Sequence, residues 1–274
     1  MRTALAIAAC LGAAGCGRLS FDGTQISDDT PPSDGAPDGG EDLLRGCLLH
    51  LRMDEPAWTG APDEAKDGCG ADHHGTAFGG ATTVDDPERG RVAELAGGAG
   101  CVQVADATGI QPTTKLTVSA WIKPTALAPS SFGIVSKRVD FGDNTAFSVF
   151  LWTDNSGGLS NQVYVDIDTE NDRTVDPTTS YLDAWRQITV VYDGALAVPS
   201  RVQFFADGAL TFTASETSAI ITQPATASPP LSIGCLPLGT PAQGFVGRIS
   251  DVAVWDRALS AAEVQAWYAA TKPP

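Results

Sequence analysis

The chain has 274 residues, a formal net charge of −16 at pH 7 and an apolar share of 43%. This acidity excludes nucleic acids and anionic membrane surfaces as partners held by charge, because phosphate contacts need clustered lysines and arginines. The apolar share allows a hydrophobic core, and the length allows one large or two small domains.

The first sixteen residues have the composition of an export signal. Arg2 supplies the positive start, residues 4–15 form a short apolar run, and Cys16 follows three small residues. The run is too short to span a bilayer. It resembles a bacterial lipoprotein signal over residues 1–16, and the alternative is an ordinary cleaved secretory peptide. We expect lipidation at Cys16 and an outer-membrane location, on the periplasmic or cell-surface side, with the lipid as the only membrane contact.

Residues 17–43 have the composition of a linker. Residues 20–43 carry seven acidic and no basic side chains, together with many prolines and glycines. Such a stretch cannot bury enough apolar surface to order itself. We therefore expect a disordered, self-repelling tether, followed by a single domain over residues 44–274.

Four cysteines follow the signal, at Cys47, Cys69, Cys101 and Cys235. An even number in an exported chain indicates disulfides, and four cysteines allow three pairings. We expect Cys47 to bond to Cys69, which closes the first loop, and Cys101 to bond to Cys235, which ties two strands together. Thiolate metal binding is not expected, because the sequence has no CxxC pair.

Short strand-like segments recur along the domain at near-regular spacing. Apolar residues alternate in 48–53, and residues 116–122 have one apolar face with Trp121 on the other. Asp207-Gly208 has the character of a two-residue hairpin turn. The predicted strands cover residues 48–53, 92–95, 101–104, 116–122, 133–137, 146–152, 162–167, 188–192, 202–206, 209–213, 231–233 and a closing stretch from 245. This pattern predicts an all-β sandwich rather than alternating helices and parallel strands.

The closing strand contains a change of register. Apolar residues stand at odd positions up to Ile249 and at even positions from Val252. A one-residue slip inside a strand is what a β-bulge produces, and a bulge re-aims a side chain. The re-aimed residue is then Asp251.

A short C-terminal helix is predicted after this strand. Ser260 and Glu263 have the spacing of a capping box, and Leu259 and Val264 have that of a hydrophobic staple. The strand therefore runs directly into a well-defined helix start.

Eight blocks follow one another between residues 49 and 264: LHLRMDE, KDGCGADHHGTAFGGA, LTVSAWIKP, GIVSK, AWRQITVVYDG, VQFFADGAL, PLSIGC and GFVGRISDVAVWDRALSAAEV. In this order they resemble a laminin G-like domain of the laminin G and pentraxin type, within the concanavalin A-like lectin/glucanase superfamily. The resemblance implies a jelly roll of two packed antiparallel sheets. It also implies binding of carbohydrate or protein ligands outside the cell, often with one Ca²⁺.

The resemblance implies a calcium site between a glycine-rich turn and the closing strand. Here Asp67, Asp72 and His74 fill the turn and Asp251 fills the strand. Calcium prefers carboxylate and carbonyl oxygens, so His74 would offer its carbonyl. The turn departs from the family pattern at Cys69. The alternative is that Asp67 caps its own turn and Asp251 accepts backbone donors at the bulge.

A row of carboxylates raises an enzymatic alternative. Asp166, Asp168 and Glu170 stand two residues apart, so an extended strand would place all three on one face. Glucanases of the superfamily use a Glu-x-Asp-x-Glu strand, and retaining glycosidases need two carboxylates across the scissile bond. Asp166 departs from that motif, and the other interpretation is an acidic loop.

Six tryptophans divide between core and surface. Trp121, Trp185 and Trp255 are expected in the core, where such sandwiches keep aromatic residues. Trp58 and Trp152 stand beside polar or Pro/Gly-rich turns, and we expect them to form an exposed platform for ligand binding.

Three hypotheses for function follow. The first is a membrane-anchored, non-enzymatic recognition module that binds glycans or an extracellular or envelope protein, since no GxSxG, HExxH or P-loop motif occurs. The second is a glycoside hydrolase or lyase that uses the carboxylate row. The third is a structural or adhesion component of the cell envelope.

Overall fold

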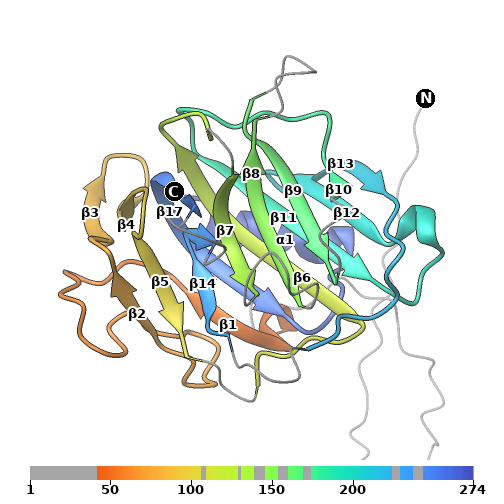
Figure 1. Ribbon diagram of the computed structural model, residues 1–274, viewed down its shortest axis with the longest axis horizontal. Helices are drawn as coiled ribbons and strands as arrows, with labels where there is room; N and C mark the ends of the chain where they lie inside the picture. Colours follow the sequence, from red (N-terminus) through yellow and green to blue (C-terminus); the bar gives the residue numbers. More distant parts are fainter. Residues whose placement is uncertain are drawn as a thin grey trace, which may run out of the picture. The chain divides into compact units, whose positions relative to one another are not determined.

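The computed structural model describes residues 42–105, 109–128, 131–138, 146–153, 160–168, 174–223, 229–236 and 243–273. The predicted signal with Cys16, the tether up to residue 41 and the candidate catalytic residue Glu170 lie outside these ranges. Two antiparallel sheets pack against each other, with one helix at the C-terminal end (Figure 1). The predicted all-β sandwich is therefore confirmed.

The larger sheet has eight strands in the order β13-β12-β11-β6-β17-β4-β3, with β1 also paired to β17. Its strands are β1 (Cys47–Leu51), β3 (Thr82–Asp86), β4 (Gly90–Ala96), β6 (Lys115–Pro124), β11 (Arg186–Asp193), β12 (Val202–Ala206), β13 (Ala209–Ala214) and β17 (Val246–Trp255). Along β6, the even-numbered side chains from Leu116 to Ile122 enter the core between the sheets. Thr117 and Trp121 alternate with them and face the other side.

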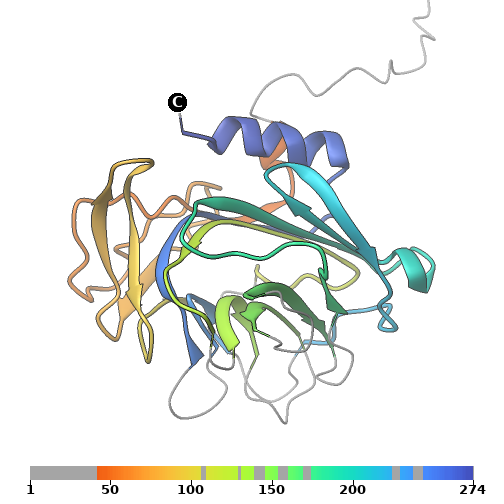
Figure 2. The same cartoon turned by 90° about the horizontal axis from the view of Figure 1, so that it is seen from above.

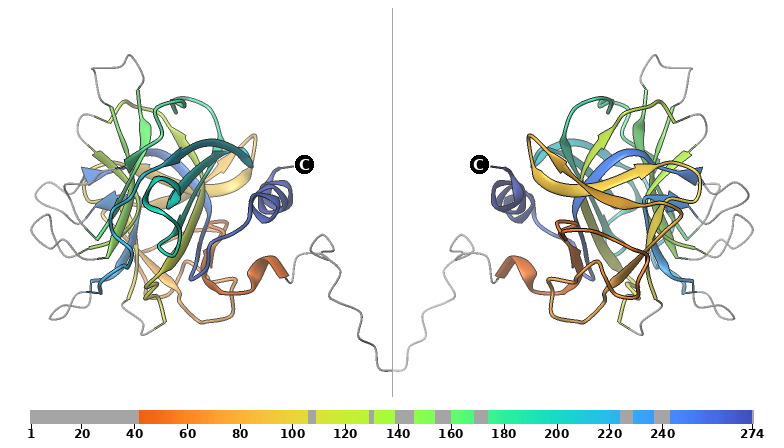
Figure 3. Two further views of the ribbon diagram at one scale, coloured as in Figure 1. Left: turned by 90° about the vertical axis from the view of Figure 1, so that its right-hand side faces the viewer. Right: turned by 90° about the vertical axis from the view of Figure 1, so that its left-hand side faces the viewer.

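The second sheet has seven strands in the order β10-β9-β8-β7-β14-β5-β2 and faces the first (Figure 3). Its strands are β2 (Gly75–Phe78), β5 (Cys101–Val104), β7 (Ser131–Lys137), β8 (Phe147–Trp152), β9 (Gln162–Ile167), β10 (Thr174–Val175) and β14 (Leu231–Ile233). A separate ribbon pairs β15 (Cys235–Leu236) with β16 (Gln243–Gly244), and two 3₁₀ turns are η1 (Asp42–Leu44) and η2 (Val198–Ser200). Sequence periodicity missed β2, β3, β10, β15 and β16, most of which are very short.

Helix α1 (Ala261–Thr271) covers the face of the eight-stranded sheet that turns away from the seven-stranded sheet (Figure 2). The predicted capping box is present, because Ser260 Oγ accepts from Glu263 N and Glu263 Oε2 accepts from Ser260 N. Val264 and Trp267 are buried against the sheet, and the Trp267 ring meets Trp255 edge to face at 5.0 Å. Among the residues described, no helix has the length and apolar composition needed to cross a membrane.

Leu43, the last residue of the predicted tether, packs against the domain. Leu43 belongs to η1 and is 6% exposed, and its carbonyl accepts a hydrogen bond from Trp255 Nε1 at 2.9 Å. The prediction assigned Leu43 to the tether because its neighbours are acidic, but its side chain packs in the core beneath α1.

Both expected disulfides are present. Cys47 bonds to Cys69 with a Cα–Cα distance of 5.8 Å, and Cys101 bonds to Cys235 with a distance of 5.4 Å. The second bond ties β5 to the β15–β16 ribbon, which lies directly on β7. A Cβ atom at Gly133 would stand 2.2 Å from the backbone of Cys235, so only glycine allows this approach.

Candidate functional site

A β-bulge interrupts β17 at Asp251. β17 pairs with β6 in register up to Ser250 and again from Ala253, so two residues oppose one between these points. Asp251 has a φ of 47°, a left-handed conformation that aspartate and asparagine adopt more readily than most residues. The core-facing side chain changes from Ile249 to Val252 across the bulge, as the sequence predicted.

Arg89 reaches Asp251 from the turn between β3 and β4. Its Nη2 donates to Asp251 Oδ2 at 2.6 Å and to the carbonyl of Thr271 at 3.1 Å. Its Nε donates to Ser250 Oγ at 3.1 Å, and Ser250 Oγ donates to Asp251 Oδ2 at 2.9 Å. The side chains of Arg89 and Asp251 are 4% and 18% exposed. This buried ion pair joins the hairpin, the closing strand and the end of α1.

Two tryptophan rings flank the guanidinium of Arg89. Its Cζ lies 4.1 Å from the ring centroid of Trp121 and 5.3 Å from that of Trp185. Such cation–π contacts are worth roughly 0.5–2 kcal/mol. Trp121 is buried as predicted, but Trp185 is only half-buried, and its indole donates to the buried carboxylate of Asp86 at the end of β3. The prediction of a core position is wrong for Trp185.

The charges of the pair are mutually stabilised. Burial alone raises the pKa of Asp251, but the contact with His50, the charge of Arg89 and the hydrogen bond from Ser250 outweigh it and hold this pKa below its ordinary value. Burial lowers the pKa of Arg89, and the carboxylate of Asp251 opposes that change. Since arginine keeps its proton in proteins, both partners are ionised at neutral pH.

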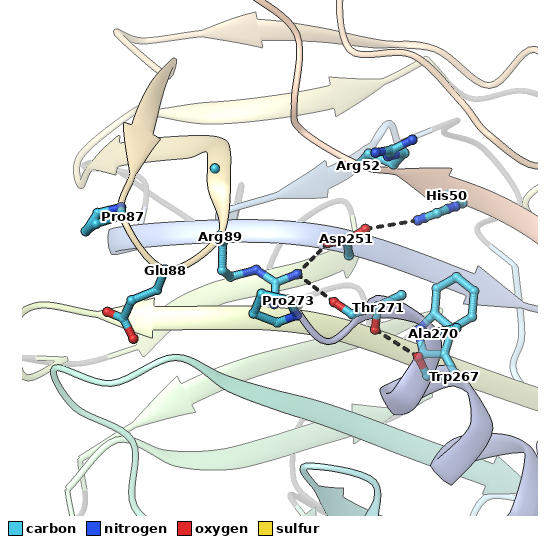
Figure 4. A pocket seen from close by; sticks show the side chains of 11 residues that line it. His50, Arg52, Pro87, Glu88, Arg89, Asp251, Trp267, Ala270, Thr271 and Pro273 are labelled. Atoms are coloured by element: carbon cyan, nitrogen blue, oxygen red, sulfur yellow. Dashed lines mark hydrogen bonds and ion pairs between the residues drawn. The ribbon is translucent and has the colours of Figure 1, made fainter.

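The pair lines a groove of about 760 Å³ between β1, the β3–β4 turn and the end of α1 (Figure 4). His50 of β1 places Nε2 3.5 Å from Asp251 Oδ1, and its ring meets Trp267 edge to face at 5.0 Å. Glu88 and Arg52 also line the groove. The groove therefore offers hydrogen-bond donors and acceptors from two strands, from the β3–β4 turn and from helix α1.

Asp67, a predicted calcium ligand, is used within its own turn. Its Oδ1 accepts from the backbone N–H of His50 at 2.9 Å and of Cys69 at 3.0 Å. Its Oδ2 accepts from the N–H groups of Ala71 and His73, each at 3.3 Å. These contacts agree with the alternative in which Asp67 caps its turn.

The predicted calcium ligands do not form one metal-binding group, although His74 contacts Asp67. His74 Nε2 lies 3.8 Å from Asp72 Oδ1, and its Nδ1 accepts from Asp67 N. Asp251 is paired with Arg89, whose positive charge disfavours a second cation. In the part of the chain that the structure describes, no three His, Cys, Asp or Glu side chains form a metal-binding group. This arrangement does not fit a calcium ion, and calcium stays a prediction from the family resemblance.

Thermal unfolding tests the calcium prediction. If calcium binds the native domain as the resemblance implies, a chelator lowers the melting temperature and added calcium restores it. The Asp67→Asn variant should lose this response. Equal melting temperatures in calcium and in chelator would contradict a calcium site.

The carboxylate row does not form on one strand face. Asp166 lies in β9, 2% exposed, with Oδ2 3.7 Å from Arg138 Nη1. β9 ends at Ile167, and Asp168 takes a left-handed φ of 60° and accepts from the backbone N–H of Thr222 at 2.7 Å. The enzymatic alternative requires an extended strand through Asp168, and this condition is not met, because β9 ends at Ile167 and the chain turns at Asp168. This removes the geometric basis of the glycosidase alternative.

The two predicted platform tryptophans have different environments. Trp58 is 7% exposed and belongs to the core between the sheets, with Nε1 donating to Glu55 at 3.0 Å, so the expectation of an exposed ring is wrong. Trp152 is half-buried near the end of β8, with its ring 5.3 Å from that of Tyr164. Tyr164 stacks in turn on Phe150 at 5.6 Å. Trp152 therefore remains a candidate for ligand contact.

Sequence reasoning missed Arg89, His50 and Trp267 as members of one site. Arg89 follows Pro87-Glu88 in a segment that has the composition of an exposed turn. The signal that was available is the bulge at Asp251, since a carboxylate turned out of a strand needs a partner. The identity of that partner, Arg89, depends on a contact between residues 162 positions apart in the chain, and no local sequence pattern contains such a contact.

Two packed antiparallel sheets and a bulged closing strand define a lectin-like β-sandwich. The Laminin_G_3 family, described as the concanavalin A-like lectin/glucanases superfamily, matches residues 96–265, and the chain belongs to this family. The family predicted from the sequence is thereby confirmed. No curated protein matches the sequence significantly.

Solved structures with the same fold include carbohydrate-binding and toxin domains. Domain 4 of AbnA, a GH43 extracellular arabinanase from Geobacillus stearothermophilus in complex with arabinotriose, is 16% identical with a TM-score of 0.56, over 80% of this chain and 97% of that one. The binding domain of Paraclostridial Mosquitocidal Protein 1 is 14% identical with a TM-score of 0.58, and the receptor binding domain of botulinum neurotoxin C/D mosaic serotype is 12% identical with 0.55. These two alignments cover 82% and 83% of this chain and 52% of each toxin chain. At such identities the likeness establishes the fold alone.

Proposed function

We propose that this domain is an extracytoplasmic recognition module that binds glycans in the groove beside Arg89 and catalyses no reaction. The observation that carries the proposal is the groove itself, where a buried ion pair is joined by further donors and acceptors. Sugars present hydroxyl groups that both donate and accept, so a glycan site needs both kinds of partner in a concave surface. The arabinotriose complex of the arabinanase domain supports the choice of ligand class.

The two disulfides support a location outside the cytoplasm, because such bonds persist in oxidising compartments. A lipid at Cys16 would then hold the domain at the outer membrane, and the acidic tether would separate it from the bilayer. Protein ligands in the envelope are the competing partner class. Crosslinking in whole cells that recovers a stoichiometric protein partner would favour that class over glycans.

A groove-filling substitution tests the glycan proposal. Ala270 is exposed on α1 and lines the groove, so the bulky side chain in Ala270→Trp should obstruct it without entering the core. We expect at least a tenfold loss of affinity for the glycan that binds best on an array, equivalent to about 1.4 kcal/mol. Ala269→Trp is the matched control, because Ala269 is also exposed on α1 but does not line the groove. If both variants bind the glycan with equal affinity, the glycan binds outside the groove.

Trp152→Ala tests the surface that the sequence pointed to. If the sugar stacks on this ring, the variant should lose at least tenfold in affinity on the same array while Ala270→Trp binds normally. The groove proposal predicts the reverse pattern. No binding of any glycan by the wild-type domain would contradict both sites.

A further inference from the structure

Three residues that line the groove each carry a buried nitrogen atom without a hydrogen-bond partner among the residues described. These atoms are Nη1 of Arg89, Nε1 of Trp267 and Nε2 of His50, which makes no hydrogen bond to a described residue but lies 3.5 Å from Asp251 Oδ1. Guanidinium and indole N–H groups only donate, and His50 donates when its Nε2 carries the hydrogen. Buried donors are paired in the great majority of cases, because an unpaired one is destabilising. Unpaired donors on three neighbouring elements indicate a ligand that brings acceptor atoms.

The charged side chains that line the groove are already neutralised. Arg89 pairs with Asp251 at 2.6 Å, and Arg52 pairs with Asp54 at 2.8 Å. Glu88 pairs with Lys123 at 2.5 Å. A dianion such as a phosphate or sulfate ester would therefore find no unpaired cation among these groups. A singly charged acceptor group suits this balance better, since it needs hydrogen bonds more than compensating charge.

We propose that the groove binds the carboxylate group of its ligand. A carboxylate has two oxygens with about four acceptor positions, which matches the unpaired donors of Arg89, His50 and Trp267. Arginine N–H groups form charge-assisted bonds to carboxylates that are stronger than bonds to a neutral hydroxyl. The proposal rests on the proposed function for the site, and it narrows the ligand to an acidic one.

This chemistry has two sources, the uronic acid of a glycan and the carboxylate end of a peptide. Titration of the ¹⁵N-labelled full chain with glucuronate and with N-acetylalanine separates them, and glucose and N-acetylalanine amide are the uncharged controls. The chain has six tryptophans, and the Trp267→Phe variant identifies the indole N–H signal of Trp267. The signal of Trp58, identified in the same way by Trp58→Phe, serves as an internal reference.

We expect an acid to shift the Trp267 indole signal, and its uncharged control to leave that signal in place. Trp267→Phe keeps an aromatic ring, smaller than the indole, and removes one donor, so it should weaken binding of the acid about tenfold, as expected for a bond to a charged group. Trp58→Phe is the matched control, because Trp58 donates to Glu55 outside the groove. The wild-type titration keeps the proposal testable even if Trp267→Phe folds poorly.

The outcomes separate this proposal from the glycan proposal. A shift of the Trp267 signal with glucuronate alone supports both the carboxylate proposal and the glycan proposal. A response to both acids, or to N-acetylalanine alone, supports the carboxylate site, and in the second case the glycan proposal falls in favour of a peptide ligand. If glucose shifts Trp267 as strongly as glucuronate, the glycan proposal stands and the carboxylate proposal is overturned. If no probe at millimolar concentration shifts the signal, the carboxylate proposal is overturned.

Discussion

Asp251→Asn is expected to lower the free energy of unfolding by about 3–5 kcal/mol, because it leaves the buried charge of Arg89 without its counterion. The side chain of Arg89 is 4% exposed, so little water reaches it to replace the carboxylate that accepts from its Nη2 at 2.6 Å. Asparagine tolerates the left-handed backbone of the bulge, so the substitution removes charge with little added strain. Denaturant unfolding of both proteins measures the difference.

Asp85→Asn is the matched control for this prediction. Asp85 pairs with Arg91 at 3.0 Å but is 84% exposed, and exposed pairs of this kind contribute about 0–1 kcal/mol. The double variant Arg89→Met/Asp251→Asn should be more stable than Asp251→Asn alone, because it no longer buries an unpaired charge. A loss in Asp251→Asn no larger than that in Asp85→Asn would contradict the central role of the buried pair.

The effect of Asp251→Asn should depend on pH in one direction. The native pKa of Asp251 lies below its ordinary value, so the unfolded chain takes up the proton first as the pH falls. The stabilising contribution is therefore complete above the unfolded pKa of about 3.9 and is lost as the pH falls through the native pKa. The difference between wild type and variant should stay constant from neutral pH to about pH 5 and shrink below about pH 4.

Local sequence pattern was sufficient to predict those elements that are stabilised by residues close together in the chain. Alternation in β6 fixed which side chains enter the core, and Asp207-Gly208 fixed the β12–β13 hairpin. Ser260 and Glu263 fixed the start of α1 because both partners of the capping box lie within one turn. The change of parity between Ile249 and Val252 located the bulge, since register is set by which face is buried.

Prediction from sequence pattern failed where contacts between residues far apart in the chain decide the position of a side chain. Trp58 stands among turn-forming residues, yet its ring completes the core between the sheets. Asp168 continues the alternation of β9 in sequence, but its carboxylate anchors Thr222, 54 residues away, and the strand stops. Arg89 is the strongest case, because an arginine in a hairpin turn is normally solvated, and only the fold places it between Trp121 and Trp185. The candidate site is made almost wholly of such contacts.

Removal of the bond between Cys101 and Cys235 is the other change expected to have a large effect. In the chain-entropy description, a cross-link stabilises by restricting the unfolded chain, and the gain grows with the loop it closes. This bond spans 134 residues, whereas the bond between Cys47 and Cys69 spans 22. We expect Cys101→Ala/Cys235→Ala to cost about 4–5 kcal/mol and Cys47→Ala/Cys69→Ala about 3 kcal/mol.

Denaturant unfolding of the two double variants beside wild type measures this order, and thiol titration of the unfolded wild-type chain verifies that the bonds are formed. Loss of the longer bond also frees β15 from β5, so the packing of Cys235 on Gly133 then depends on strand pairing alone. Weaker packing there destabilises the native state, so it adds to the loss of stability that comes from the greater entropy of the unfolded chain. If both double variants lose the same stability, or if the loss is larger for Cys47→Ala/Cys69→Ala, restriction of the unfolded chain does not control the stabilisation. The bond at Cys47 would then support native contacts, such as the one between Asp67 and the backbone of His50, which loop length does not measure.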